Sequence, residues 1–151
     1  MPTQDLTTYA KTDPNGRFAV IEPQVLATAL SRDEAAFVQR DFGLGYFGAT
    51  FTHLLRVKCT AIGGDYGAAE IWGVAAANNT GNGTLSAQTA HIRLRYNYGT
   101  AFVLSDGVTS QSWTGASLNT DYWVKITRNG VSLTVQFYTD AALTGLAATI
   151  S

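Results

Sequence analysis

The sequence predicts an all-β fold built from antiparallel strands, as either a two-sheet sandwich or a barrel. Three observations support this prediction: many short segments alternate between apolar and polar residues, Gly and Asn separate these segments, and no segment has the pattern of a long helix. Residues 32–36 and 140–143 are the only candidates for a helical turn. The chain has 151 residues, which is long enough for one domain with its own core.

The expected strands follow one another at short spacing. Residues 1–12 are polar and lack periodicity, so we expect an N-terminal arm and then one domain over 13–151. A turn cluster, Asp-Pro-Asn-Gly at 13–16, opens this domain. The predicted strands cover 17–22, 25–30, 35–40, 49–60, 69–76, 89–98, 101–105, 108–113, the two arms of a hairpin within 121–138, and 146–151.

The hairpin is the clearest element. Two alternating runs flank Asn129-Gly130, a typical sequence for a two-residue type I′ turn. This turn predicts the pairs Ile126 with Leu133, Val124 with Val135, Tyr122 with Phe137, Thr127 with Ser132, Lys125 with Thr134 and Trp123 with Gln136. One face is then apolar, and Trp123 is the exception on the polar face. Because a slip of one residue would invert every side chain, we interpret the pattern as fixing the register.

The composition excludes several classes of protein. Charged residues make up 14% of the chain, against about 25% in ordinary globular domains, a profile common in extracellular and virion β-proteins. A net charge of -1 argues against nucleic acid as a partner, because phosphate binding needs a basic surface. No apolar run approaches the roughly 18 residues of a membrane span, so no membrane insertion is expected. The single Cys59 excludes an internal disulfide framework.

Three segments, in their order along the chain, resemble concanavalin A-like domains of the laminin G and pentraxin type. They are 13–17 (Asp-Pro-Asn-Gly-Arg), 47–53 (Phe-Gly-Ala-Thr-Phe-Thr-His) and 122–130, which is followed by 137–140 (Phe-Tyr-Thr-Asp). Versions of this domain occur in phage and bacterial surface proteins. The resemblance implies a jelly roll of two packed antiparallel sheets, binding of carbohydrate or protein, calcium in some members and glycosidase activity in a minority.

One departure from the family pattern bears on assembly. Domains of this family carry further strands after the segment that matches 143–150, whereas this sequence ends at Ser151. We expect that the sequence is a fragment, that a sheet edge is open, or that the arm or another subunit fills the gap. An open apolar edge favours strand addition from a neighbour, so we expect self-assembly.

The residues do not predict an enzyme, and we assign no catalytic residue. Family glycosidases carry Glu-x-Asp-x-x-Glu on one strand, but Glu22, Glu34 and Glu70 stand apart here. The two histidines lack a nucleophile elbow nearby. His53 lies on the same face of its predicted strand as apolar neighbours, so we expect a core histidine bonded to a backbone carbonyl. His91 lies on the same face as polar neighbours, so we expect it to be solvated.

Candidate binding residues lie on loops and on aromatic positions. The tentative ligand-facing rim consists of Tyr66, Trp72, Asn78, Asn79 and Asn82. For Trp72 we expect partial burial, and for the loops an ordinary connection is the alternative. Trp123 and Tyr138 share a parity on adjacent strands and are the tentative interface residues, with cover by a loop or ligand contact as alternatives. No cofactor is required; if calcium binds, Asp41 and Asp65 are its candidate donors.

Together these features predict a non-enzymatic structural or adhesion module of a virion or cell surface. Its expected partners are copies of itself or other surface proteins. The alternative is a monomeric carbohydrate-binding, lectin-like module that uses the rim around Tyr66 and Trp72 to bind a glycan.

Overall fold

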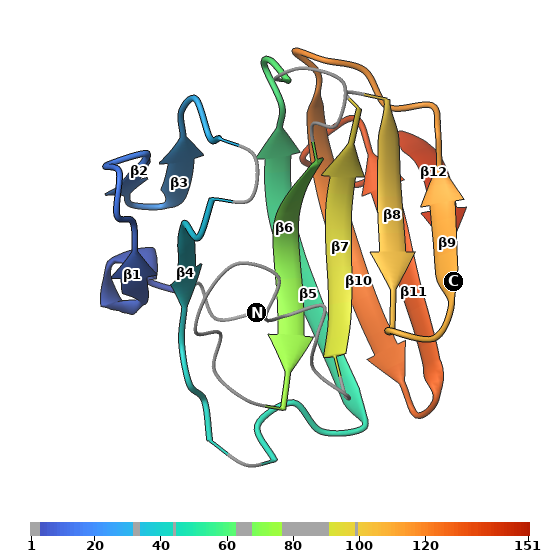
Figure 1. Cartoon of the computed structure of the whole chain (residues 1–151). Coiled ribbons are helices and arrows are strands. Elements are labelled where there is room, and N and C mark those ends of the chain that lie inside the picture. Colours follow the sequence, from blue (N-terminus) through green and yellow to red (C-terminus); the bar gives the residue numbers. More distant parts are fainter. Residues whose placement is uncertain (1–3, 32–33, 44, 63–67, 77–90, 99) are drawn as a thin grey trace.

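The computed structural model is an all-β sandwich of two four-stranded antiparallel sheets (Figure 1). It describes residues 4–31, 34–43, 45–62, 68–76, 91–98 and 100–151. The front sheet of Figure 1 has the order β6 (Ala68–Ala75), β7 (His91–Asn97), β8 (Ala101–Ser105), β9 (Ser110–Trp113). The back sheet has the order β12 (Leu146–Ile150), β11 (Ser132–Tyr138), β10 (Asp121–Asn129), β5 (Thr50–Lys58). The predicted sandwich is therefore confirmed.

The N-terminal strands lie beside the β5/β6 side of the sandwich (Figure 1). β1 (Ala10–Thr12) pairs with β4 (Phe37–Gln39), and β2 (Phe18–Ile21) pairs with β3 (Gln24–Ala27). A short 3-10 helix, η1 (Leu6–Thr8), precedes them, and the Asp5 side chain accepts a hydrogen bond from Thr7 N at its start. We call this part, residues 4–39, the N-terminal unit. Every strand predicted from residue 17 onward is confirmed within a few residues, and β1 is a strand within the segment that we expected to be an arm.

The predicted turn at 13–16 has a clear physical cause. The Asp13 carboxylate accepts hydrogen bonds from the backbone N–H groups of Arg17 and Phe18, at 2.6 Å and 2.9 Å. Gly16 has a φ of 67°, a left-handed conformation that glycine adopts more readily than other residues because it lacks a Cβ atom. The chain therefore reverses here and enters β2.

The predicted hairpin register is wrong by two residues. Asn129 pairs with Ser132, so the loop consists of Gly130 and Val131. Of these two loop residues, only Gly130 has a positive φ, 62°. This fits a type II′ turn with Gly first and not a type I′ turn, which needs a positive φ at both positions. The observed pairs include Ile126 with Val135, Val124 with Phe137 and Trp123 with Tyr138. A shift of two residues preserves parity, so each side chain still lies on the face that the alternation predicts.

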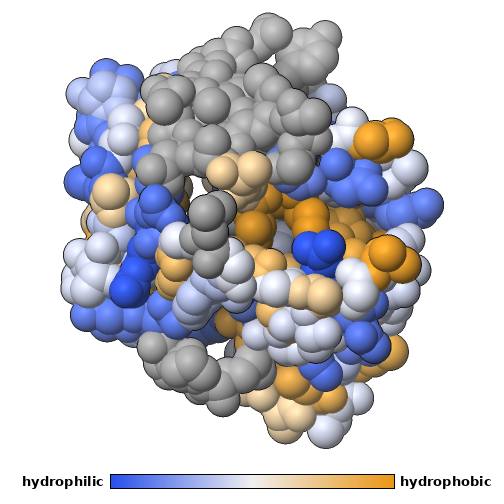
Figure 2. Space-filling model, turned by 90° about the horizontal axis from the view of Figure 1, so that it is seen from below, coloured by the Kyte–Doolittle hydropathy of each residue, from blue (hydrophilic) through white to orange (hydrophobic). Residues whose placement is uncertain are grey.

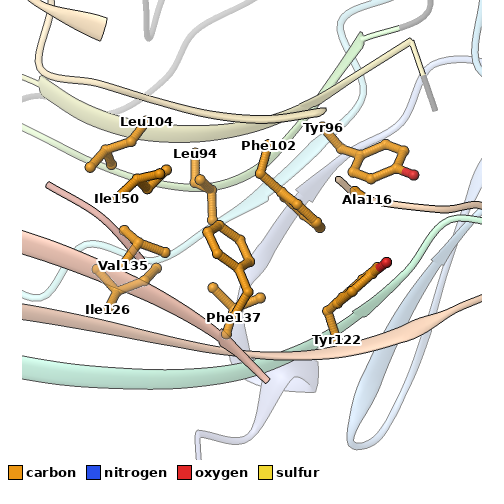
Figure 3. Packing of buried hydrophobic residues seen from close by; sticks show 11 residues of the cluster. Leu94, Tyr96, Phe102, Leu104, Ala116, Tyr122, Ile126, Val135, Phe137 and Ile150 are labelled. Carbon is orange, nitrogen blue, oxygen red and sulfur yellow. The ribbon is translucent and has the colours of Figure 1, made fainter. Parts of the chain in front are cut away.

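The core lies between the two sheets. Side chains from both sheets meet there, as Figure 3 shows, and Phe102 of the front sheet lies 4.6 Å from Phe137 of the back sheet, centroid to centroid. The buried cluster contains Leu94, Tyr96, Phe102, Leu104, Ala116, Tyr122, Val124, Ile126, Val135, Phe137 and Ile150. No residue described before His91 is fully buried. The N-terminal unit thus lacks a buried core among its described residues.

Both histidines differ from their predicted environments. His53 accepts a hydrogen bond at Nδ1 from the indole Nε1 of Trp72, at 3.0 Å, where we expected a backbone carbonyl as partner. His91 is only 6% exposed, although we expected it to be solvated. The turn after β8 covers its ring: a Cβ atom added to Gly107 would lie 2.8 Å from His91 Cε1. The alternation of residues along β7 could not show that His91 is buried, because the turn that covers it lies elsewhere in the sequence.

Candidate functional site

The predicted ligand rim is represented in the structure by Trp72 alone. Tyr66, Asn78, Asn79 and Asn82 lie outside the described residues. Trp72 is partly buried, as predicted, and packs against the core cluster. Its ring meets His53 edge-on, with 5.6 Å between centroids. The indole N–H donates to His53, so it is not available to a ligand.

The structure brings the two predicted interface residues, Trp123 and Tyr138, together. They are direct partners in the β10–β11 register. On the other side of Trp123, the Arg56 guanidinium carbon lies 5.5 Å from its ring centroid, a cation–π contact. Tyr138 is only 8% exposed, so the patch offers less aromatic surface than the sequence suggested. The role of Trp123 and Tyr138 in an interface stays a prediction.

A carboxylate fixes the cation over Trp123. Arg56 Nε donates to Asp121 Oδ1 at 2.9 Å, and Lys58 Nζ lies 3.9 Å from the other oxygen. The hydrogen bond from Arg56, together with the charges of Arg56 and Lys58, holds the pKa of Asp121 below its usual value. The outer face of the back sheet therefore carries a cluster of opposite charges beside Trp123.

The candidate calcium donors are not brought together in the described structure. Asp65 lies outside the described residues. Asp41 is exposed, and its Oδ1 accepts a hydrogen bond from Gly43 N at 2.7 Å, which closes a local turn. Within the ranges that the structure describes, no group of three or more His, Cys, Asp or Glu residues could hold a metal ion.

One side of the sandwich carries two edge strands without any charged residue. β9 and β12 are the edges of their sheets and lie next to each other. Their sequences are Ser-Gln-Ser-Trp and Leu-Ala-Ala-Thr-Ile. On the opposite side, the edge strands β5 and β6 carry Arg56, Lys58 and Glu70. We call the first side the β9/β12 side.

A cleft opens at the end of the sandwich where the β8–β9 and β10–β11 turns lie. Its volume is about 540 Å³, and we call it the end cleft. Figure 2 looks at this end and shows hydrophobic residues among polar ones. Apolar side chains from both sheets and from the segment before β5 line it, among them Phe47, Val74, Ile92 and Leu133. Arg128 and Asp106 are its charged lining residues among those described.

Arg128 was not among the predicted site residues, although the sequence contains a signal for it. Tyr122, Val124 and Ile126 alternate along β10 and are buried, and Arg128 is the next residue of the same parity. The predicted hairpin pairs ended at Thr127, and Arg128 was assigned to neither face. The continued alternation predicts instead that its side chain begins on the inward face, at the end of the core.

The fold and these surfaces define an all-β, two-sheet antiparallel sandwich domain. In comparisons with models of protein families, with curated proteins and with solved structures, none matched this chain. In the described part of the chain, no helix has the length and apolar character needed to cross a membrane.

Proposed function

We propose that this domain is a non-enzymatic structural or adhesion module, of the jelly-roll type, that assembles with copies of itself on a virion or cell surface. The observation that carries the proposal is the uncharged β9/β12 side. Other proteins of the same surface are further partners of the same kind.

Edge strands expose backbone N–H and C=O groups, and most proteins protect them with charges, proline or bulges. β12 contains neither charge nor proline, and small side chains at Ala147 and Ala148 let another strand approach closely. A bulge shifts the β11–β12 register near Tyr138, but the pairs from Ala148 to Ile150 are regular. The exposed edge of this part of β12 therefore suits the addition of a strand.

The N-terminal unit gives independent support. Isolated two-stranded sheets are marginally stable in water, since they bury little apolar surface. The β2–β3 pair nevertheless exposes about half of Ile21 and Leu26, at 53% and 51%. Contact with a neighbouring molecule would remove these side chains from water and stabilise the unit.

A charge on the β12 edge tests the proposal. Thr149→Lys places a lysine on an exposed position of β12, and Thr50→Lys places the same charge on β5, the opposite edge of the same sheet. By sedimentation velocity, we expect concentration-dependent association of the wild type and of the Thr50→Lys control. Thr149→Lys should weaken association by about tenfold or more, which corresponds to about 1.4 kcal/mol. A wild type that stays monomeric at high micromolar concentration, or two variants that associate equally, would contradict it.

The alternative function, a monomeric carbohydrate-binding module, has one specific observation in its favour. Leu94 and Tyr96 of β7 face the core, so Arg93, Arg95 and Asn97 lie on the outward face of the front sheet. Arg93 donates to Glu70 Oε1 at 2.7 Å. Among the described residues, the Nε atoms of both arginines and Oδ1 of Asn97 are buried without a hydrogen-bond partner.

These atoms have no contact with solvent, so a glycan would pair with them only after the side chains turn outward; its hydroxyls both donate and accept hydrogen bonds, and unpaired buried groups are costly. A glycan array probed with the monomeric protein tests this function. Arg95→Gln should abolish the signal, and Arg56→Gln, on the other sheet, should preserve it. An array without signal would remove this alternative and leave the assembly proposal unchanged.

A further inference from the structure

In each sheet, a row of inward-facing side chains along one strand leads to a charged residue at the end cleft. In the back sheet, the row Val124, Ile126 continues to Arg128, which pairs across the sheet with Leu133 and Phe51. Arg128 Nε donates to the carbonyl of Gly130 at 3.0 Å, which uses one of the five guanidinium donors and orients the group.

In the front sheet, the row Phe102, Leu104 continues to Asp106, in the turn after β8. Its Oδ1 accepts hydrogen bonds from the backbone N–H groups of Thr109 and Val108, at 2.7 Å and 2.9 Å. These bonds lower the pKa of Asp106, so the carboxylate is charged at neutral pH. The Thr109 hydroxyl also donates to Oδ1, so none of these three hydrogen bonds uses Oδ2.

The two opposite charges line the same cleft but do not pair. Within the described part of the chain, the ion pairs involve other residues, and none joins Arg128 to Asp106 or to another carboxylate. The same cleft also has an apolar lining that includes Val74, Ile92 and Leu133. At about 540 Å³, the cleft is within the range of small-ligand sites, roughly 300–1,000 Å³.

We propose that the end cleft binds a short apolar peptide in its zwitterionic form. The peptide carboxylate pairs with Arg128, because a guanidinium accommodates a carboxylate through two parallel hydrogen bonds. The peptide ammonium pairs with Asp106, and the apolar side chains of the peptide cover the apolar lining of the cleft. The buried ring of His91, packed on Gly107, forms part of the wall.

Other ligand classes fit these residues less well. A fatty acid would satisfy Arg128 and the apolar lining but would place its charge in a cleft that also holds the Asp106 carboxylate. A nucleotide needs several cations for its phosphates, and a sugar would leave the apolar lining unmatched. Only a ligand with both charges and an apolar body uses all three features.

The site does not depend on self-assembly, because it lies at the end of the sandwich and not on the edge of β12. Isothermal titration calorimetry with the dipeptide Leu-Leu tests it, together with N-acetyl-Leu-Leu, which lacks the ammonium, and Leu-Leu amide, which lacks the carboxylate. We expect saturable binding of Leu-Leu to one site, and binding of each derivative weaker by about tenfold or more, as expected for loss of a charge-assisted hydrogen bond.

Two variants assign the charges to the residues. Arg128→Gln should weaken Leu-Leu to the level of Leu-Leu amide while leaving the amide unchanged, and Asp106→Asn should do the same for the N-acetyl derivative. Arg56→Gln, outside the cleft, should bind all three ligands as the wild type does. The proposal is overturned if Leu-Leu does not bind at millimolar concentration, if the three ligands bind equally, or if the variants fail to remove the discrimination. The comparison of ligands needs only the wild-type protein, so it stands even if a variant does not fold.

Discussion

The hydrogen bond between Trp72 and His53 joins the two sheets near their β5/β6 side, and its removal should have a measurable cost. The indole Nε1 donates to His53 Nδ1 at 3.0 Å, so this nitrogen carries no proton in the folded state. Trp72→Phe keeps an aromatic ring but removes the donor and leaves a partly buried acceptor unsatisfied. An orphaned polar group costs about 1–3 kcal/mol, and the smaller ring leaves some space, so we expect a loss near the middle of that range.

The partial burial of His53 predicts a dependence of stability on pH. Burial lowers the pKa of His53 from its ordinary value of 6.5. At pH above 6.5, the imidazole is neutral in both states and its full contribution is present. As the pH falls below 6.5, the unfolded state binds a proton that the folded state resists, so stability falls until the pH passes the folded pKa.

Urea unfolding of the wild type and of His53→Gln, measured between pH 8 and pH 5, isolates this effect. A glutamine can accept from the indole but does not titrate in this range, and His91 is common to both proteins. We expect the wild type to lose stability relative to the variant as the pH falls. Parallel pH profiles for the two proteins would refute the lowered pKa of His53.

Three substitutions test the packing of the sandwich by urea unfolding. Phe137→Ala should cost about 3–5 kcal/mol, because the side chain is fully buried between Phe102 and Trp113, and a loss under 1 kcal/mol would contradict the core. Gly107→Ala should cost about 2–4 kcal/mol, since a φ of 89° and a contact of 2.8 Å with His91 combine strain with a clash. Gly130→Ala should cost only about 1 kcal/mol, because its φ of 62° is strained but nothing lies within 4 Å, and equal costs for the two glycines would refute the role of His91.

Much of the sandwich was predictable because its strands alternate locally. Parity alone assigns Val124 and Ile126 to the core, and the structure confirms both as fully buried. Parity cannot distinguish registers that differ by two residues, so the hairpin prediction depended on the turn type. That choice failed because Val131, and not Asn129, occupies the loop with Gly130.

The remaining differences arise from contacts that are distant in sequence. β1 has three residues, too few to show a period, and it forms because β4 pairs with it. The burial of His91 depends on a turn that follows β8. The end cleft combines Arg128 and Asp106 from different sheets, so only the fold brings them together, although the inward parity of Arg128 was visible in the sequence.

The pairing of β5 has a consequence for synthesis of the chain. Its neighbour in the back sheet is β10, and Lys58 aligns with Asp121. A ribosome therefore delivers this nine-residue strand long before its partner emerges. During translation the apolar side of β5 stays exposed until β10 is synthesised. We therefore expect chaperones to bind nascent chains that are halted before β10, and not full-length chains.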